Sequence, residues 1–256
     1  MINLQTTAFL DIKLGDGQLS FGESVKSVEP ACRTLDEARY AFLDAEVAGR
    51  TDLYYMYRDV AREIDRAHLA KYGLRFDITV IMPGLIGQEF NKTVGHYHPV
   101  KSGTTYTYPE VYEVLSGEAT YLLQRPGPLV GRVADAYVVV ARAGDKVVIP
   151  PGYGHITINA KSVPLVMTNW VAADFASVYG EIKDLRGGAY YLLEKNSTSL
   201  WMPNPRYTGL PALRFRAQED YAQFGLKASE PMYKLIFESP ENLRFLTHPE
   251  EFAWVE

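Results

Sequence analysis

The sequence has little cysteine, no long apolar run and little net charge. Cys32 is the one cysteine in 256 residues, which excludes an internal disulfide and favours a reducing, cytoplasmic compartment. No window approaches the roughly 20 apolar residues that a membrane-spanning helix needs. Residues 1–15 lack the basic and apolar regions of a signal peptide. We therefore expect a cytoplasmic protein that has no membrane partner.

The charge balance excludes a second class of partner. The formal net charge is −5 at pH 7, whereas a nucleic-acid-binding protein needs clustered Lys and Arg to contact phosphates. Hydrophobic residues make up 47% of the chain, so a substantial core can be buried. The composition indicates a globular protein that does not bind nucleic acid.

Short apolar runs, broken by Gly and Pro, dominate the middle of the chain. Their close and even spacing is typical of strands in a sandwich or small barrel, so we predict an all-β fold. We expect one domain over residues 1–256, with a barrel core at about 50–185, an N-terminal extension at 1–49 and a C-terminal extension at 186–256. The runs are Leu53–Tyr57, Arg75–Met82, Gly95–Pro99, Val111–Leu115, Ala119–Gln124, Ala136–Ala141, Lys146–Ile149, His155–Asn159 and Leu165–Trp170.

The flanking segments carry weaker signals. Thr34 stands three residues before Glu37, the spacing of a capping box, and predicts a helix from about Leu35 to Val47. The polar stretch from Arg58 to Tyr72 suits either a short helix or a long hairpin. In the C-terminal extension two further strands are predicted, Ala189–Glu194 and Met232–Phe237.

Two histidines and one glutamate share a predicted direction. His96 and His98 are two residues apart, so on an extended segment both imidazoles point to the same face. On the next predicted strand Glu110 shares a face with Tyr112, whereas Glu113 points the other way. The two histidines and Glu110 can therefore enter one space inside the barrel.

His155 completes a candidate metal site. It follows Pro150-Pro151-Gly152, a rigid turn, and is one of only five histidines. The other two, His68 and His248, lie in polar surroundings and are expected at the surface. Three imidazoles and one carboxylate suit a divalent first-row metal ion with open positions, Fe²⁺ first and Mn²⁺ or Ni²⁺ next, while Zn²⁺ more readily closes its shell at four ligands.

The same residues carry a resemblance to the cupin superfamily. The second cupin motif is matched at every defined position, and the first is matched in part, by His96-x-His98 and by Glu110 with Gly117 six residues further on. Phe90 replaces the usual Gly, and the segment between His98 and Glu110 is longer than usual. Its extra residues, Val100–Pro109, are expected as a loop at the barrel mouth. The resemblance implies a double-stranded β-helix, or jelly-roll barrel. The second motif reads Gly144-x₅-Pro150-Pro151-Gly152-Tyr153-Gly154-His155-x₃-Asn159.

Within the cupins, the chain resembles the cupin-type glucose-6-phosphate isomerases over roughly Arg33 to Lys183. The implied activity is the interconversion of glucose 6-phosphate and fructose 6-phosphate, a step of glycolysis and gluconeogenesis. The resemblance implies that Thr79, Thr93 and the backbone of Gly95 hold the phosphate, and that Tyr54, Tyr112 and Tyr179 line the sugar. Ser177 stands where the family often has a His. The resemblance is carried by Leu53–Arg58, Phe76–Val80, Pro83-Gly84, Thr93–His98, Pro109–Tyr112 and Tyr179-Gly180.

An aldose–ketose isomerase moves hydrogen between C1 and C2 of the sugar. Glu110 is the one acidic residue whose strand phase aims it at the proposed metal, so it acts as a ligand alone or as a ligand and general base. A direct hydride shift between the two carbons stays open as an alternative. A homodimer is expected, because cupin barrels leave sheet edges and apolar faces that a second copy commonly covers.

Three other functions fit the same residues. The first is a metal-dependent cupin that acts on another sugar phosphate, and the second is an Fe-dependent dioxygenase. The third is a non-catalytic sugar-binding cupin. The hydroxyl of Thr93 beside the backbone amide of Gly95 favours a phosphorylated ligand over the dioxygenase.

Overall fold

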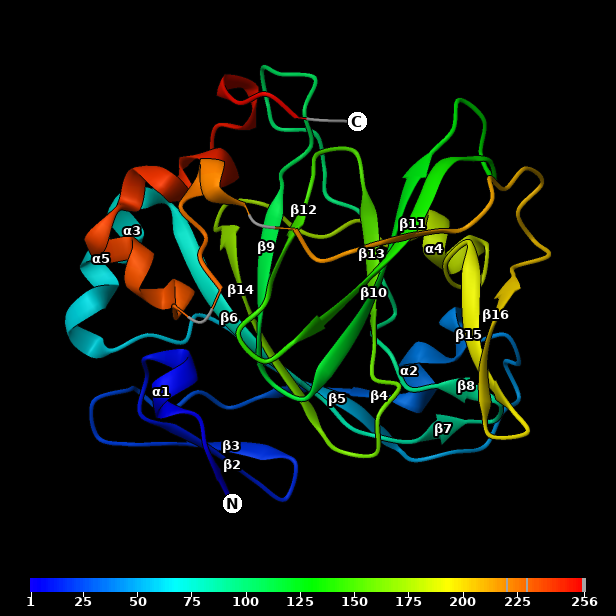
Figure 1. Ribbon diagram of the computed structural model, residues 1–256, viewed down its shortest axis with the longest axis horizontal. Coiled ribbons are helices and arrows are strands. Elements are labelled where there is room, and N and C mark those ends of the chain that lie inside the picture. The colour runs from blue at the N-terminus through cyan, green and yellow to red at the C-terminus, as the bar shows by residue number, and fades with distance from the viewer. Residues whose placement is uncertain (220, 229, 255–256) are drawn as a thin grey trace.

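Two sheets face each other and enclose a hydrophobic core. The computed structural model describes residues 1–219, 221–228 and 230–254. The strand order of the first sheet is β12-β9-β14-β6-β5-β4 and that of the second is β13-β10-β11-β17 (Figure 1). The first sheet consists of β4 (Ala31–Thr34), β5 (Asp52–Tyr57), β6 (Leu74–Ile81), β9 (Glu110–Ser116), β12 (Lys146–Ile149) and β14 (Leu165–Ala172), and the second of β10 (Glu118–Pro126), β11 (Val133–Arg142), β13 (Gly154–Ile158) and β17 (Arg214–Arg216).

The side chains of each strand alternate between the interior of the barrel and its outer face. On β9, Tyr112 and Val114 enter the interior core, where they meet Tyr121 and Val139 of the opposite sheet. The interleaved Val111 points outward into a different cluster. This period of two is the expected pleat of a strand, and it confirms the all-β barrel that the cupin resemblance implied.

The remaining elements belong to the two ends of the chain and to short connections. None of the helices in the described ranges has the length and apolar character that a membrane crossing needs. The helices and 3₁₀ turns are α1 (Gln5–Ala8), α2 (Leu35–Ala38), η1 (Arg39–Ala41), η2 (Glu63–Asp65), α3 (Arg66–Tyr72), α4 (Gly180–Asp184), η3 (Ala222–Phe224), η4 (Met232–Lys234), α5 (Leu235–Glu238), η5 (Pro240–Leu246) and η6 (Pro249–Glu251). The other strands are β1 (Ile2–Asn3), β2 (Ile12–Gly15), β3 (Gln18–Phe21), β7 (Leu85–Ile86), β8 (Glu89–Phe90), β15 (Tyr190–Lys195) and β16 (Thr198–Pro203).

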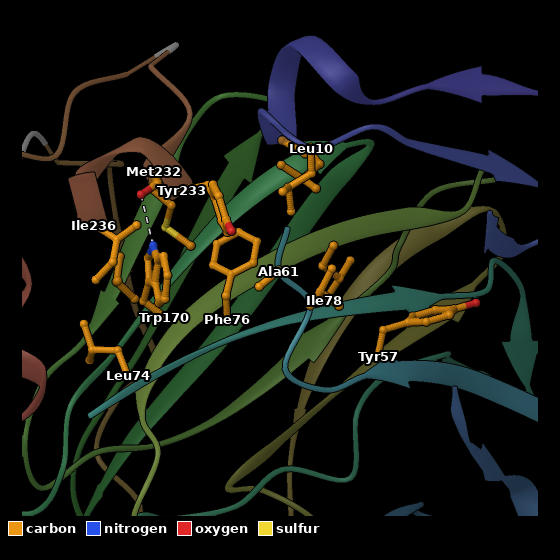
Figure 2. Close-up of a cluster of buried hydrophobic side chains, with 14 of the residues drawn as sticks. Leu10, Tyr57, Ala61, Leu74, Phe76, Ile78, Trp170, Met232, Tyr233 and Ile236 are labelled. Atoms are coloured by element: carbon orange, nitrogen blue, oxygen red, sulfur yellow. Dashed lines mark hydrogen bonds between the residues drawn. The ribbon is translucent and has the colours of Figure 1, made fainter. Parts of the chain in front are cut away.

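Both extensions cover the outer face of the six-stranded sheet. Phe76 of β6 and Trp170 of β14 point outward and pack on Tyr233, with ring centroids 4.9 and 5.8 Å away. Figure 2 shows this cluster together with Leu10 of the N-terminal extension, and it shows Trp170 Nε1 donating to the carbonyl oxygen of Met232 at 3.0 Å. The chain therefore buries this sheet face with its own ends.

The segment after α4 covers the second sheet in the same way. β15 and β16 form a hairpin that pairs with β8, and Tyr190 and Leu192 pack with Leu122 and Ile156 from the outer face of the four-stranded sheet. In Figure 1 this hairpin lies beside α4 at the edge of the barrel.

Several predicted elements need correction. The capping box at Thr34 and Glu37 is present, but the helix predicted to reach Val47 ends at Ala38, and a 3₁₀ turn ends at Ala41. Arg39 explains the early end, because its guanidinium donates to the carbonyl oxygen of Val47 at 2.6 Å and folds the chain back. The polar stretch after β5 contains a helix, α3, and no hairpin.

The strand predicted at Met232–Phe237 is wrong, because that segment is helical in η4 and α5. The buried residues are Met232, Tyr233 and Ile236, a spacing that gathers side chains on one face of a helix. The predicted run Gly95–Pro99 forms isolated bridges instead of a strand. Positions 220, 229, 255 and 256 of the predicted C-terminal extension lie outside the described residues.

Candidate metal centre and substrate pocket

Backbone pairing brings His96 beside His155. The two residues form an antiparallel bridge, in which each N–H donates to the carbonyl oxygen of the other, at 3.3 and 3.1 Å. Their ring centroids are 4.5 Å apart. With His98 and Glu110, they offer one ligand atom each, and these four atoms all lie within 4.8 Å of one another. The four residues predicted as ligands are thus together in space.

His98 is oriented by the inserted segment Val100–Pro109. Its Nδ1 lies 2.8 Å from the carbonyl oxygen of Tyr108, a contact that requires the proton to be on Nδ1. The lone pair of a neutral ring is then on Nε2, which points to His96 Nε2 at 3.1 Å. Metal-bound histidines commonly make this contact with a backbone carbonyl, because it fixes both the ring and its tautomer.

Glu110 stands at the start of β9 and is buried against two of the histidines. Its Oε2 lies 3.3 Å from Nε2 of both His98 and His155. Burial raises the pKa of this carboxyl, but the contacts with His98 and His155 outweigh burial and hold the pKa below its usual value. Glu110 is therefore ionised at neutral pH.

His96 and His155 are in the neutral form that binds metal. Burial is the main cause of the low pKa of His96, and burial also lowers the pKa of His155 to about 4. Neutral imidazoles and an ionised carboxylate are the ligand forms of these residues. Within the described part of the chain, the buried Glu110 Oε2 and His155 Nδ1 have no hydrogen-bond partner. The donor set fits a divalent cation.

A cavity of about 380 Å³ opens beside these four residues. Every residue predicted to contact the substrate lines it, so the sequence prediction and the cavity coincide in position. Those residues are Tyr54, Thr79, Thr93, Gly95, Tyr112 and Tyr179.

Local bonding fixes the segment from Thr93 to Gly95. The hydroxyl of Thr93 accepts a hydrogen bond from the N–H of Thr157 at 3.0 Å, and the hydroxyl of Tyr54 accepts one from the N–H of Val94 at 3.4 Å. Gly95 has a φ of +81°, and a Cβ there would lie 2.3 Å from Ile156 Cγ1. The fold therefore requires glycine where a backbone amide is proposed to meet the phosphate.

Two tyrosines lie next to the candidate ligands. The hydroxyl of Tyr112 is 3.0 Å from His155 Nε2, and the ring of Tyr179 is 5.6 Å from that of His96. Ser177 also lines the cavity. It occupies the position where the resembled family often has a histidine, so in this chain a hydroxyl is offered there.

Sequence reasoning missed three polar residues that line the same cavity, Arg58, Arg75 and Asn169. A signal for Arg58 was present, because it follows the predicted strand Leu53–Tyr57 four residues after Tyr54, and residues four apart in an extended run share a face. For Asn169 the sequence offered only a polar residue inside an apolar run.

Comparisons with known proteins agree with this site. A family model described as Glucose-6-phosphate isomerase (GPI) matches residues 30–207. The Glucose-6-phosphate isomerase of Pyrococcus horikoshii is 31% identical over 190 residues, which cover 72% of this chain and 90% of the relative. The relative from Thermococcus litoralis is 28% identical over 190 residues, with the same two coverages. The relative from Pyrococcus abyssi is 33% identical over 134 residues, 52% of this chain and 65% of the relative.

Among solved structures the similarity is weaker. A mutant oxalate decarboxylase of Bacillus subtilis aligns with 50% of this chain and 28% of its own, at 19% identity and a TM-score of 0.36, which is too low to support an argument. The family match spans well over half of the described chain and contains all four candidate ligands. The chain belongs to the glucose-6-phosphate isomerase family.

Proposed function

We propose that this chain interconverts glucose 6-phosphate and fructose 6-phosphate with a divalent metal ion held by His96, His98, Glu110 and His155. The observation that carries the proposal is the meeting of four ligand atoms within 4.8 Å at the wall of one cavity. Fe²⁺ is proposed first, with Mn²⁺, Ni²⁺ and Zn²⁺ as other candidates, because imidazole and carboxylate ligands suit all four.

The bound ion would act as a Lewis acid that polarises the sugar carbonyl and makes the hydrogen on C2 more acidic. Glu110 is the proposed general base: its carboxylate removes the proton from C2 of glucose 6-phosphate and returns it to C1. The ionised state of Glu110 supports this role, because a base must be unprotonated before the reaction starts.

The remaining cavity residues would position the substrate. Thr79, Thr93 and the N–H of Gly95 are proposed to hold the phosphate, whose binding energy fixes the sugar at a distance from the reacting carbons. Tyr54, Tyr112 and Tyr179 are proposed to contact the sugar, which suits side chains that combine an apolar ring with a hydroxyl.

The proposal extends to the assembly and the compartment. We infer a homodimer, supported by exposed apolar residues on the outer face of β11 and β17, Val140 and Phe215. We also infer a cytoplasmic location, supported by the single free cysteine, Cys32.

A coupled assay tests the function. Fructose 6-phosphate is supplied, and the formation of glucose 6-phosphate is followed with a reporter enzyme that uses it. The assay is run before and after EDTA treatment and then with added Fe²⁺, Mn²⁺, Ni²⁺ or Zn²⁺. We expect activity that EDTA abolishes and metal restores. Unchanged activity in EDTA would contradict the metal, and no activity with any of the four metals would contradict the isomerase.

A further inference from the structure

A row of polar residues crosses the wall of the cavity between Glu110 and Thr79. Its members are Arg58, Asp77, Asn169 and Tyr112. The strand register places Asn169 of β14 opposite both Asp77 of β6 and Tyr112 of β9. Arg58, directly after β5, extends the row, because its guanidinium Nη1 donates to Asp77 Oδ2 at 2.7 Å. Glu110 lies two residues before Tyr112, on the same face of β9. Thr79 lies two residues after Asp77, on the same face of β6.

Asp77 is fully buried and serves to hold the cationic end of this row. Besides Arg58, it accepts hydrogen bonds from Arg75 Nε at 2.9 and 3.0 Å and from the N–H of Asp59 at 2.9 Å. A buried carboxylate needs such partners, because its desolvation is costly when it is unpaired. The position of the Arg58 guanidinium is thereby set by the fold before any ligand binds.

Arg58 keeps donors available on its other side. Its side chain is 48% exposed, and it lines the cavity. A guanidinium has five N–H donors. Nη1 donates to Asp77 Oδ2 and Nη2 donates to Met56 Sδ at 3.3 Å, which leaves three donors for a ligand. Asn169 is buried and lines the same wall. No hydrogen bond is recorded between its side chain and another described residue, so its amide also faces the cavity.

The charge of Arg58 reaches the proposed metal end of the cavity. Burial is the main cause of the low pKa of His96, and the positive charge of Arg58 lowers that pKa further. The pKa of Arg58 itself is raised: burial opposes the charge, but Asp77, Tyr112 and Glu110 outweigh it. The guanidinium is therefore a permanent cation in the same cavity wall as the carboxylate that would act as base.

We propose that Arg58, positioned by Asp77, binds the reacting end of the sugar and stabilises the negative charge that forms there. The inference rests on the proposed isomerase function. When Glu110 takes the proton from C2, the electron pair of the C–H bond forms the C1–C2 double bond, and the C1 carbonyl oxygen gains the charge. A guanidinium N–H donates to this oxygen and remains protonated throughout. The proton of the C2 hydroxyl is transferred to the C1 oxygen, and the proton held by Glu110 returns to C1, so that the ketose forms with its carbonyl at C2. Asn169 holds a neighbouring hydroxyl.

A charge held in advance by the protein is worth most where charge appears only in the transition state. Arg58 should therefore affect turnover more than substrate binding. This prediction separates it from Thr79, Thr93 and Gly95, whose proposed contact with phosphate is present before and during the reaction.

The test compares four variants with wild type: Arg58→Met, Arg58→Lys, Asp77→Asn and the control Arg142→Met. Arg142 is an exposed arginine on β11 that pairs with Glu118 away from the cavity. For Arg58→Met we expect kcat to fall roughly 100-fold with KM changed less than about threefold. Arg58→Lys keeps the charge but loses the planar guanidinium, and Asp77→Asn keeps the arginine but removes the carboxylate that positions it. We expect kcat to fall about tenfold in both variants. Arg142→Met should match wild type.

Chemical rescue separates this role from a structural one. In Arg58→Ala, which should retain stoichiometric metal, millimolar guanidinium should raise kcat several-fold, and it should not do so in Arg142→Met. Wild-type kcat in Arg58→Met, a rise in KM alone, or absence of rescue in a folded, metal-loaded Arg58→Ala would overturn the inference while leaving the isomerase intact. An inactive wild-type protein would instead refute the proposed function.

Discussion

Two glutamates on β9 show how the phase of a strand decides the chemistry of a residue. Glu110 faces the barrel interior and contacts two imidazoles, whereas Glu113 faces outward, where it pairs with Lys146 at 2.9 Å and accepts the N–H of Met232 at 2.8 Å. Burial raises the pKa of both carboxyls. At Glu113 the effect of burial is the larger one, and the pKa is raised to about 7. At Glu110 the contacts with the imidazoles outweigh burial, and the pKa is lowered. Three positions along one strand thus separate a candidate base from a structural carboxylate.

The first prediction concerns His155. Replacement by Ala removes one of four ligands, so we expect the metal content, measured by plasma emission after gel filtration, to fall well below one ion per chain, and most activity to be lost. His248→Ala is the matched control, because that histidine lies outside the cluster. Stoichiometric metal in His155→Ala would show that this ligand assignment is wrong.

The second prediction separates the two roles of Glu110. Glu110→Gln keeps the size and one oxygen donor but loses the charge and the basicity. If Glu110 is also the base, saturating metal should leave kcat lower by roughly 10²–10⁴-fold. If it is a ligand alone, excess metal should restore most of the turnover.

Solvent deuterium gives an independent readout of the same role. An enediolate formed through an exchanging base incorporates deuterium at C2 of glucose 6-phosphate during turnover, whereas a direct hydride shift does not. Rapid turnover by metal-saturated Glu110→Gln, combined with no deuterium in the wild-type product, would leave Glu110 as a ligand alone.

At the scale of elements, the inserted segment Val100–Pro109 connects the C-terminal extension to the candidate metal site. Its Lys101 pairs with Glu250 at 2.6 Å, and its Tyr108 stacks on Phe175 and supplies the carbonyl that orients His98. The longer segment in the first cupin motif therefore fixes the ring of a candidate ligand.

The third prediction concerns how firmly the C-terminal extension is held. Phe245 of η5 is fully buried and stacks on Phe224 at 4.2 Å. Phe245→Ala should lower the free energy of unfolding by about 3–5 kcal/mol, because it removes a large buried side chain and leaves a cavity. Phe237→Ala, in the same extension but 36% exposed, should cost about 1 kcal/mol. Equal costs, measured by urea denaturation, would mean that the extension is not packed as a core.

At the scale of the molecule, the sheet faces that a partner copy often covers are occupied by the chain's own ends. Leu4, Leu10 and Tyr233 belong to the cluster on the outer face of the six-stranded sheet. In Figure 1 the N-terminal hairpin and α5 lie against that sheet from two sides. We therefore place the proposed dimer contact on the other sheet, at the edge strand β17, where Phe215 is exposed.

The fourth prediction concerns the homodimer. Multi-angle light scattering at micromolar concentration should give twice the chain mass of 28.8 kDa. Phe215, 68% exposed on the edge strand β17, is the apolar residue best placed for the contact, so Phe215→Asp should shift the population toward the monomer. A single 28.8 kDa species for the wild-type protein would contradict the homodimer.

Much of the barrel and the candidate site could be read from the sequence, because both depend on short-range periodicity. The period of two placed His96 with His98 and separated Glu110 from Glu113, and the Pro-Pro-Gly turn marked the approach to His155. The Thr34 capping box was also predicted correctly, since its contacts join residues three apart. Periodic and local signals of this kind survive in any tertiary context that leaves the strand in place.

What the tertiary structure decided depends on long-range contacts. The segment Met232–Phe237 is helical because Tyr233 and Ile236 meet the outward face of a sheet built from residues far earlier in the chain. Arg58 faces the cavity because Asp77, nineteen residues away, holds it there. The sequence by itself determined which side chains share a face. Only the folded chain determined which faces meet, because the desolvation and packing that select those contacts join residues with no pattern in common.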